Sequence, residues 1–381
     1  MLCIGILLPR SNIFPSFGID ILNGLKEFLK SQQVYNQFKL VTDNISYGIN
    51  EAEVYTKAEK MLLQDDADVV ILCADVRAAE MLQPLFTASN KILLVLNTGA
   101  NFPESWQPAP TTITHSLNFC THTMLTGKLA ALETNKNAIN TVSYYDAGYR
   151  QCFSMLSSHQ ANGGIPMYTH VTDARLEAFT VEPVAAFLEA TPDIKTLLCL
   201  FSCDQAEKFY QQIAALQKKY DLNLFVSPMM FEESLIASLQ EVEGIKNVKG
   251  YIPWHSSLTN EANRSFKNVF TGKPNYFSLL GWESGMLLQE ILKQSQTGNT
   301  NATSLIQALT GLQFDSPRGW IKIDKATQHS FGPAYLASLK DTMQVSVDER
   351  TATGENEWNE FIKFAVIKGD YSGWRNTYLC I

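Results

Sequence analysis

Short, almost continuous apolar runs recur along this chain, and each is followed by a polar loop and a segment whose apolar residues have helical spacing. In the first third of the chain these runs lie at residues 4–8, 68–72 and 92–96. A strand that is apolar at nearly every position needs cover on both faces, as in a parallel sheet flanked by helices. Strands that alternate with helices in units of about 30 residues are typical of right-handed βαβ crossovers. The sequence therefore predicts an α/β fold built on parallel sheets.

The same pattern starts again in the middle of the chain, with strands expected at residues 138–144, 195–200 and 222–226. A chain of 381 residues is long for one core. Two successive sets of similar size predict two doubly wound parallel-sheet lobes that face each other. The remaining pieces, a helix at 276–292 and a β-rich part near 320–339, are too few to bury a core of their own. They must complete the two lobes, so the chain crosses between them more than once.

The composition is acidic, with a formal net charge of −8 and a pI near 5.4. Because the chain has no surplus of Lys and Arg and no basic run, nonspecific binding to nucleic acid is excluded. No apolar stretch approaches the ~20 residues that a membrane-spanning helix needs. The first residues lack the basic region and the small-residue cleavage site of a signal peptide. We expect either a cytosolic protein or an exported one whose signal peptide is not part of this chain.

Motifs for catalysis, metals and cofactors are missing from the sequence. The segment 281–285, GWESG, is not a nucleophile elbow, because its serine stands one place late within a predicted helix. Neither the Gly-rich dinucleotide fingerprint nor a P-loop occurs. Cys199 and Cys203 straddle a strand end, but no second pair at metal-ligand spacing accompanies them among the seven cysteines. The sequence predicts no enzyme activity, no metal site and no cofactor.

Three stretches resemble the type I periplasmic binding proteins, specifically the branched-chain amino acid (Leu/Ile/Val) receptors of ABC transporters. Residues 4–12, IGILLPRSN, with Gly18 opening a helix, are similar to the family's first strand, loop and helix. Residues 67–71, ADVVI, followed by 92–100, ILLVLNTGA, resemble its strand pair ending in a turn. Residues 309–324, LTGLQFDSPRGWIKID, are similar to its segment of the form L-x-G-x-x-F-x-G-P-x-G-x-x-x-F-D.

This resemblance implies two lobes joined by a three-crossing hinge, with crossings near residues 115–119, 250–254 and 329–333. Residues 1–117 with 253–330 would form lobe 1, and residues 118–252 with 331–381 would form lobe 2. A ligand would be trapped between the lobes by hinge closure, which it favours through its higher affinity for the closed form. The resemblance also implies an ABC-transporter permease as partner, a monomer, and a periplasmic or cell-surface location after removal of a signal peptide.

The resemblance places the ligand-binding residues at the carboxyl ends of strands, which is where open parallel sheets bind ligands. From lobe 1 these are Arg10, Ser11, Asn12, Phe14, Ala74, Asp75, Asn97, Thr98, Gly99 and Ala100. From lobe 2 and the hinge they are Tyr145, Asp146, Tyr149, Ser202, Asp204, Met229 and Trp254.

Two departures from the family pattern bear on the ligand. Asp75 stands at or beside the serine that meets a ligand carboxylate in the family, where an acid would repel that group. For Arg10 three alternatives remain open: a bidentate pair with a ligand carboxylate, a pair with Asp75, or a solvated or lobe-bridging side chain. The family's acid for the ligand ammonium has no equivalent, because the corresponding loop at 228–231 reads PMMF.

We therefore expect a solute-binding protein that traps a small polar or amphipathic molecule, amino-acid-like or related, and delivers it to an ABC transporter. The alternative is a ligand-sensing receptor that uses the same two lobes to control a protein partner. The C-terminal stretch with Trp358, Trp374 and Cys380 is expected to pack on the second lobe.

Overall fold

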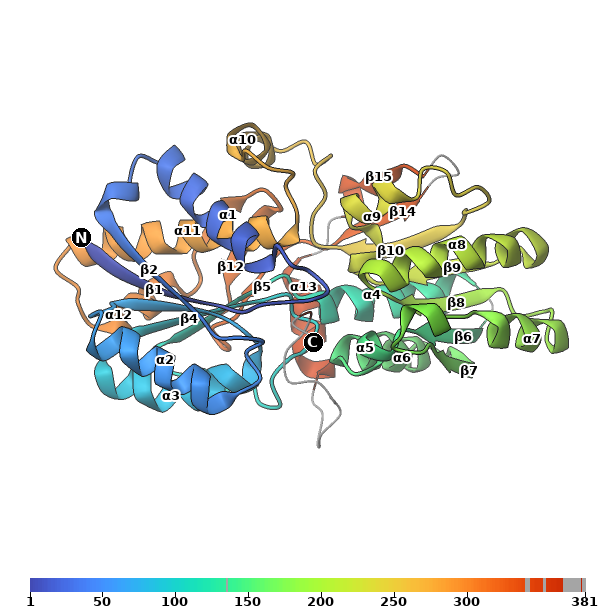
Figure 1. The fold of residues 1–381 in the computed structure, drawn as a ribbon, viewed down its shortest axis with the longest axis horizontal. Helices are drawn as coiled ribbons and strands as arrows, with labels where there is room; N and C mark the ends of the chain where they lie inside the picture. Colours follow the sequence, from blue (N-terminus) through green and yellow to red (C-terminus); the bar gives the residue numbers. More distant parts are fainter. Residues whose placement is uncertain (135, 340–342, 352–353, 366–377, 379–381) are drawn as a thin grey trace.

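The computed structural model describes residues 1–134, 136–339, 343–351, 354–365 and 378. They form two α/β lobes that lie side by side (Figure 1). The expected fold class, with two lobes built on parallel sheets and joined by several crossings, is confirmed. None of the helices in this part of the chain is both long and apolar enough to cross a membrane.

The first lobe is built on a parallel sheet with the strand order β2-β1-β3-β4-β5. Its strands are β1 (Leu2–Leu8), β2 (Phe38–Asn44), β3 (Val69–Cys73), β4 (Ile92–Asn97) and β5 (Thr112–Ser116). Its helices are α1 (Phe17–Ser31), α2 (Glu51–Leu63), α3 (Val76–Ser89), α10 (Glu261–Val269), α11 (Tyr276–Gln296) and α12 (Ala302–Leu309), with the short η1 (Tyr35–Gln37).

Both faces of this sheet are buried, which explains why its strands are apolar at successive positions. Ile4 and Ile6 belong to the same core as Leu25 of α1. Cys3 and Leu7, which alternate with them along β1, pack with the residues of α2 and α3. Side chains on a strand point to opposite faces in turn, so a helix layer on each side demands apolar residues at odd and even positions alike.

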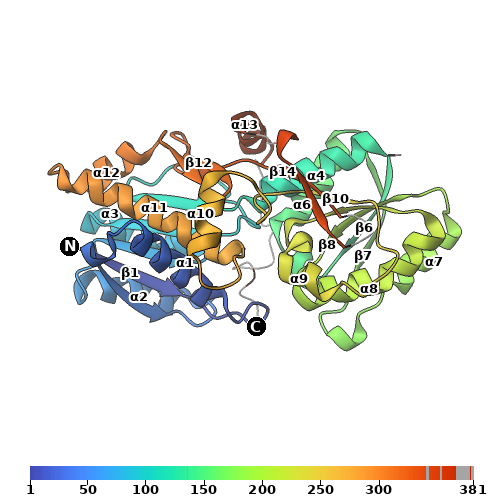
Figure 2. The same cartoon turned by 90° about the horizontal axis from the view of Figure 1, so that it is seen from above.

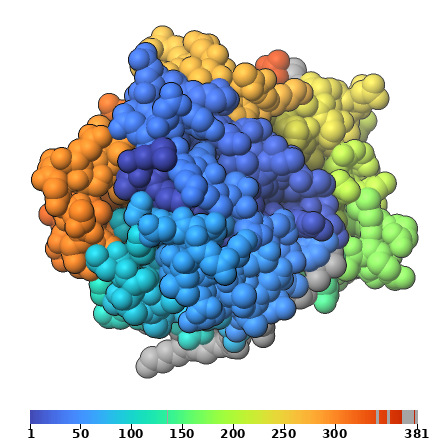
Figure 3. All heavy atoms as spheres, turned by 60° about the vertical axis from the view of Figure 1, so that its left-hand side comes forward, coloured from blue at the N-terminus to red at the C-terminus, as the bar shows by residue number. Residues whose placement is uncertain are grey.

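Segments that are distant in the sequence share the first lobe. Figure 3 shows the N-terminal part in blue and the α11–α12 part in orange on one face of the molecule. Gly24 of α1 and Gly281 of α11 let these two helices touch through their backbones. A Cβ at Gly281 would overlap the carbonyl oxygen of Ile21, and one at Gly24 would overlap that of Ser278. The GWESG segment is therefore a helix-packing motif.

We expect Gly281→Ala to lower the free energy of unfolding by about 1–3 kcal/mol, since one added methyl group must push α1 and α11 apart. Urea denaturation measures this loss. Lys293→Ala on the same helix is the control, because Lys293 is exposed and pairs with Glu290 at the surface. Equal stabilities of the two variants would contradict the close helix crossing.

The second lobe is built on a mixed sheet with the order β15-β14-β10-β9-β8-β6-β7. Its parallel strands are β6 (Asn137–Val142), β7 (Ile165–Val171), β8 (Thr196–Leu200), β9 (Asn223–Val226) and β10 (Val248–Ile252). The strands β14 (Tyr335–Leu339) and β15 (Val345–Asp348) add to β10 in antiparallel orientation. This sheet is thus parallel in its main part and antiparallel at one edge.

Helices cover both faces of the second sheet (Figure 2). The residues of α4 (Phe119–Glu133) and α6 (Arg150–Ala161) pack on one face. Those of α7 (Glu182–Ala190) and α8 (Cys203–Tyr220) pack on the other. The shorter elements are α5 (Tyr144–Ala147), α9 (Glu233–Ser238), η2 (Leu176–Ala178), η3 (Pro228–Phe231) and η4 (Glu349–Thr351).

Three connections join the lobes, between β5 and α4, between β10 and α10, and between β13 and β14. A small antiparallel sheet of β11 (Gln313–Ser316), β12 (Gly319–Ile323) and β13 (Ser330–Phe331) lies next to the hinge on the side of lobe 1. The helix α13 (Glu355–Phe364) follows β15 and η4. Its Trp358 packs against Trp106 of lobe 1, and the helix also contacts α4, so it covers the hinge and not lobe 2 alone. Trp374 and Cys380 lie outside the described residues.

Candidate ligand-binding site

Loops that follow the parallel strands of both sheets meet between the lobes. Lobe 1 contributes the loops after β1, β3 and β4, and lobe 2 contributes those after β6 and β8. The carboxyl ends of the strands therefore face one another across the cleft, which is the place predicted for ligand binding.

The loop after β1 places only part of its predicted residues inside the cleft. Ser11 is buried, and its Oγ accepts a hydrogen bond from the backbone N–H of Phe14 at 2.9 Å. Phe14 is half-buried and lies against Phe277 of α11, with ring centroids 5.1 Å apart. Arg10 and Asn12 are exposed. No ion pair joins Arg10 to Asp75 in the described part of the chain, and the exposed Arg10 side chain agrees with the solvated alternative.

The loops after β3 and β4 are held together by side-chain amides. Asp75 is buried and accepts a hydrogen bond from Asn101 Nδ2 at 3.2 Å. Asn97 Oδ1 accepts from the N–H of Gly99 at 3.0 Å, which closes the turn. Gly99 has a φ of +71°, and a Cβ there would lie 2.6 Å from the backbone N of Asn118. This turn needs glycine both for its conformation and for its close approach to the hinge. Ala74, Thr98 and Ala100 are buried beside it.

Asp146 is the centre of a buried polar cluster in lobe 2. Its Oδ2 accepts from Ser143 Oγ at 2.6 Å and from Ser202 Oγ at 3.0 Å, and its Oδ1 accepts from Gln151 Nε2 at 3.0 Å. Burial raises the pKa of Asp146 to about 6, although the three hydrogen bonds oppose this rise. The carboxylate therefore fixes the side chains of Ser143, Ser202 and Gln151 in one orientation.

The two lobes are hydrogen-bonded to each other through this region. The N–H of Gln151 donates to the carbonyl oxygen of Ala100 at 3.0 Å, and the N–H of Arg150 donates to Asn101 Oδ1 at 2.9 Å. Cys203 Sγ donates to the carbonyl oxygen of Ile13 at 3.0 Å. These contacts join elements of opposite lobes directly, so the structure is a closed form.

Tyr378 lies inside the cleft, between residues of both lobes. Its ring is surrounded by Phe14, Phe119 and Tyr149, with centroids 5.7, 6.3 and 5.3 Å away respectively. Gln151 Nε2 donates to its hydroxyl oxygen at 3.0 Å. We call the set of residues around Tyr378, namely Phe14, Phe119, Tyr149, Asp146 and Gln151, the aromatic site.

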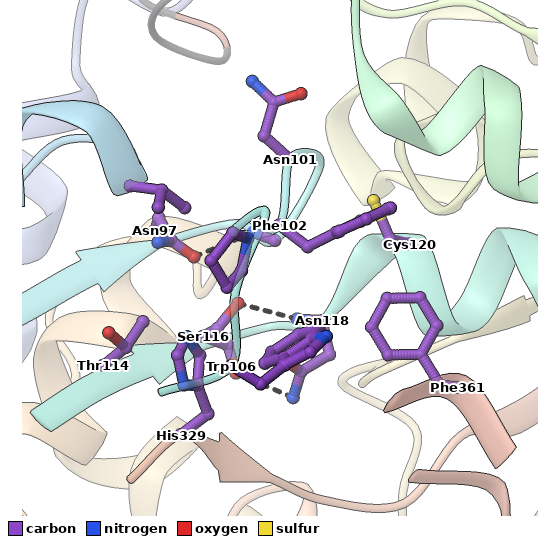
Figure 4. Close-up of a pocket in the computed structure, with 13 residues that line it drawn as sticks. Asn97, Asn101, Phe102, Trp106, Thr114, Ser116, Asn118, Cys120, His329 and Phe361 are labelled. Atoms are coloured by element: carbon purple, nitrogen blue, oxygen red, sulfur yellow. Dashed lines mark hydrogen bonds between the residues drawn. The ribbon is translucent and has the colours of Figure 1, made fainter. Parts of the chain in front are cut away.

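A small cavity lies next to the hinge, and none of its lining residues belongs to the aromatic site. It is lined by Trp106, Phe102, Asn118, His329 and Phe361 among others, and Figure 4 shows these side chains around it. Its volume of about 20 Å³ accepts a water-sized group. Pockets for drug-sized ligands measure roughly 300–1,000 Å³, so this cavity does not hold a solute.

Glu283, Arg318 and His115 form a buried ionic network next to the hinge. Glu283 of α11 accepts from Arg318 Nε at 2.9 Å, and its other oxygen lies 3.0 Å from His115 Nε2. Burial alone would raise the pKa of Glu283, but the charge of Arg318 and the contact with His115 lower it to about 2. The carbonyl oxygen of Arg318 accepts from the hydroxyl of Tyr335 on β14 at 2.7 Å. The network thereby reaches from the core of lobe 1 to a strand of the second sheet.

Several predicted residues lie away from the aromatic site. Asp204 is exposed, and Tyr145 is half-buried and packs on Tyr144. Met229 is buried in the core. Trp254 is buried and donates from Nε1 to Asn263 Oδ1 at 2.9 Å.

Residues that sequence reasoning missed complete the site. Phe119 is predicted only as part of a crossing. Gln151 stands two positions after the predicted site residue Tyr149, and Asn101 stands one position after the predicted site residue Ala100. Tyr378 is more than two hundred residues from its partners in lobe 2, so no local pattern could place it there.

A family model described as "Periplasmic binding protein" matches residues 2–344. The chain belongs to the periplasmic binding protein family. The type I periplasmic binding protein family, expected from the three stretches of sequence, is confirmed. Members of this family are solute-binding proteins of ABC transporters and not enzymes, so this binding protein is a solute-binding receptor.

Solved structures share the fold of this binding protein at low sequence identity. A solute-binding protein from R. palustris in complex with benzoate is 22% identical, with a TM-score of 0.73, over 91% of this chain and 95% of that chain. Another from R. palustris, in complex with 4-hydroxybenzoate, is 14% identical, with a TM-score of 0.74, over 94% and 98%. A leucine-binding protein from Thermotoga maritima is 12% identical, with a TM-score of 0.67, over 94% and 100%. No curated protein gives a significant sequence match.

Proposed function

We propose that this binding protein captures a small amphipathic solute that carries an aromatic ring, and that the ring binds in the aromatic site. The observation that carries the proposal is the convergence of Phe14, Phe119 and Tyr149 beside the Asp146–Gln151 pair. Aromatic rings pack edge to face at the centroid distances found here, and a buried amide provides a directed hydrogen bond at one end. The Oγ of Ser11 supplies a polar contact at the other end.

Two lines of support come from outside the site. Structurally similar solute-binding proteins hold benzoate and 4-hydroxybenzoate, which are aromatic and amphipathic. The loop at 228–231 lacks the acid that the family uses for an ammonium group, which argues against a free amino acid. Of the predicted residues, Ser11, Phe14, Asp146, Tyr149 and Ser202 remain the candidates for this site.

The rest of the role follows as part of the same proposal. The closed receptor presents its solute to the permease of an ABC transporter and acts as a monomer. It works in the periplasm or at the cell surface after removal of a signal peptide. Residues 1–117 with 253–330, and 118–252 with 331–381, are the two lobes that move about the hinge.

The test is a binding screen with benzoate, 4-hydroxybenzoate and L-leucine, in which melting temperature and calorimetric titration report binding. Aromatic ligands at millimolar concentration should raise the melting temperature, and leucine should not. Phe14→Ala should weaken the affinity for the best aromatic ligand about tenfold, because one ring contact and its buried area are lost.

Phe187→Ala is the matched control, since Phe187 is a half-buried ring stacked on Tyr168 in lobe 2. It should leave the affinity unchanged. A receptor that binds leucine and no aromatic compound would contradict the proposal.

A further inference from the structure

Tyr378 has no exposed surface, although it belongs to the end of the chain. Ring contacts to Phe14, Phe119 and Tyr149 account for its apolar part. Phe14 comes from lobe 1 and Tyr149 from lobe 2. The ring therefore occupies the position between the lobes where a ligand of this fold class would lie.

The backbone N–H, the backbone carbonyl oxygen and the side-chain hydroxyl of Tyr378 each also make a hydrogen bond. Its N–H donates to the hydroxyl of Tyr149 at 3.0 Å, and its carbonyl oxygen accepts from Ser11 Oγ. Its hydroxyl accepts from Gln151 Nε2, which Asp146 holds in place. Three directed contacts, one from the loop after β1 and two from the start of α6, make a complete binding mode for one residue.

We propose that Tyr378 is an intramolecular ligand of the aromatic site, and that the soluble ligand which replaces it is a tyrosyl amide, as found within a short peptide. This inference rests on the proposed function, because it names the solute class of the same site. In wild-type protein, soluble ligand and Tyr378 compete for one position.

The chemistry of the contacts selects an amide over a free amino acid. The nitrogen of Tyr378 meets a neutral phenol hydroxyl, which suits an uncharged N–H donor. A buried ammonium without a carboxylate partner would be strongly disfavoured. The ring hydroxyl has a fixed donor in Gln151, and a phenylalanyl ligand would leave that buried donor without this acceptor. The site therefore prefers a 4-hydroxyphenyl ring that bears an amide nitrogen and a carbonyl group.

The loss of apparent affinity that a tethered residue causes for a soluble ligand can be calculated. A group on the same chain as its binding site acts as if it were present at an effective concentration on the order of millimolar. If the tethered residue itself has a Kd of about 0.1 mM for the site, any soluble ligand would bind roughly tenfold more weakly to the wild type than to a protein without the tethered group.

The test measures the Kd of N-acetyl-L-tyrosinamide for wild type, Tyr378→Ala and Tyr378→Phe by calorimetry. Tyr378→Ala should bind it about tenfold more tightly than wild type, and Tyr378→Phe should fall between the two. Within Tyr378→Ala, N-acetyl-L-phenylalaninamide and L-tyrosine should each bind at least tenfold more weakly than N-acetyl-L-tyrosinamide. Small-angle scattering of Tyr378→Ala should show a larger radius of gyration that returns to the wild-type value with ligand.

Tyr55→Ala is the control for the loss of a tyrosine, because Tyr55 is exposed on α2 and far from the cleft in sequence and fold. It should match wild type in affinity and scattering. Equal affinities of wild type and a folded Tyr378→Ala would overturn the intramolecular ligand. If Tyr378→Ala instead gained affinity for 4-hydroxybenzoate and not for the tyrosyl amide, the amide assignment would be wrong. Failure of both proteins to bind any aromatic compound would refute the proposed function itself.

Discussion

Glu283→Gln should lower the free energy of unfolding by about 3–5 kcal/mol, the largest stability effect that we expect in this protein. The substitution leaves the Arg318 guanidinium buried without its counter-charge, and Arg318 is 0% exposed. It also weakens the acceptor for Ser316, whose Oγ donates to Glu283. Urea denaturation at pH 7 measures the loss, and Glu290→Gln on the same helix should cost no more than about 1 kcal/mol, because its partner Lys293 is exposed.

The pH dependence gives an independent check of the same network. The pKa of Glu283 is about 2 in the folded protein, below its ordinary value of 4.5. A lowered folded-state pKa contributes stability that is present above the unfolded value and is lost as the pH falls through the folded value. Wild type should therefore lose more stability than Glu283→Gln between pH 4.5 and pH 2. Parallel losses in the two proteins would show that the carboxyl is not ionised in the native state.

Asp146→Ala should abolish high-affinity binding at the aromatic site, with an affinity loss of at least tenfold. Without the carboxylate, three buried donors on Ser143, Ser202 and Gln151 lose their common acceptor. Each unsatisfied buried donor costs about 1–3 kcal/mol, and Gln151 is no longer held toward the ligand hydroxyl. Calorimetric titration in the Tyr378→Ala background measures the effect without competition from the tethered residue. Asp173→Asn, an exposed carboxyl change in lobe 2, is the control and should leave affinity unchanged.

Asp146→Asn tests the protonation of this group. Burial raises the folded-state pKa of Asp146 from 3.8 to about 6. A raised folded-state pKa contributes stability that is fully present below the unfolded value and is lost as the pH rises through the folded value. Between pH 4 and pH 6 the stability of wild type should therefore decline relative to Asp146→Asn, and the difference should be constant above pH 6. A flat difference over the whole range would contradict the buried titrating carboxyl.

The strands of the first lobe could be predicted because burial on both faces leaves a continuous apolar signal. The runs at 68–72 and 92–96 correspond to β3 and β4 within one residue at either end. The strand β7 could not be found in this way. It lies at the edge of its sheet, alternates mainly between exposed and half-buried residues, and contains Pro166. Edge strands tolerate proline and carry a weaker apolar signal.

The sequence could predict which residues of the candidate site lie near strand ends, but not which way their side chains point. Ser11, Asp146 and Ser202 each stand two to four positions after the end of a strand, and the structure places all three in the cleft. Arg10 also follows a strand, yet its side chain is exposed while its backbone N–H bonds to Ser46 at 2.6 Å. Which way a loop residue turns depends on such contacts with distant segments. Asp75 likewise meets Asn101, a partner that no spacing rule connects to it.

The long helix α11 has a consequence for how the protein is made. It covers the same face of the first sheet as α1, but the ribosome synthesises it long after β5, the last strand of that sheet. Until α11 emerges, the N-terminal sheet has an incompletely covered apolar face. The part of lobe 2 from α4 to β10 is contiguous and is finished before α11 begins. Although domains generally fold in the order of synthesis, we expect the second lobe to fold first here, so that the nascent N-terminal half is the segment that needs protection from aggregation.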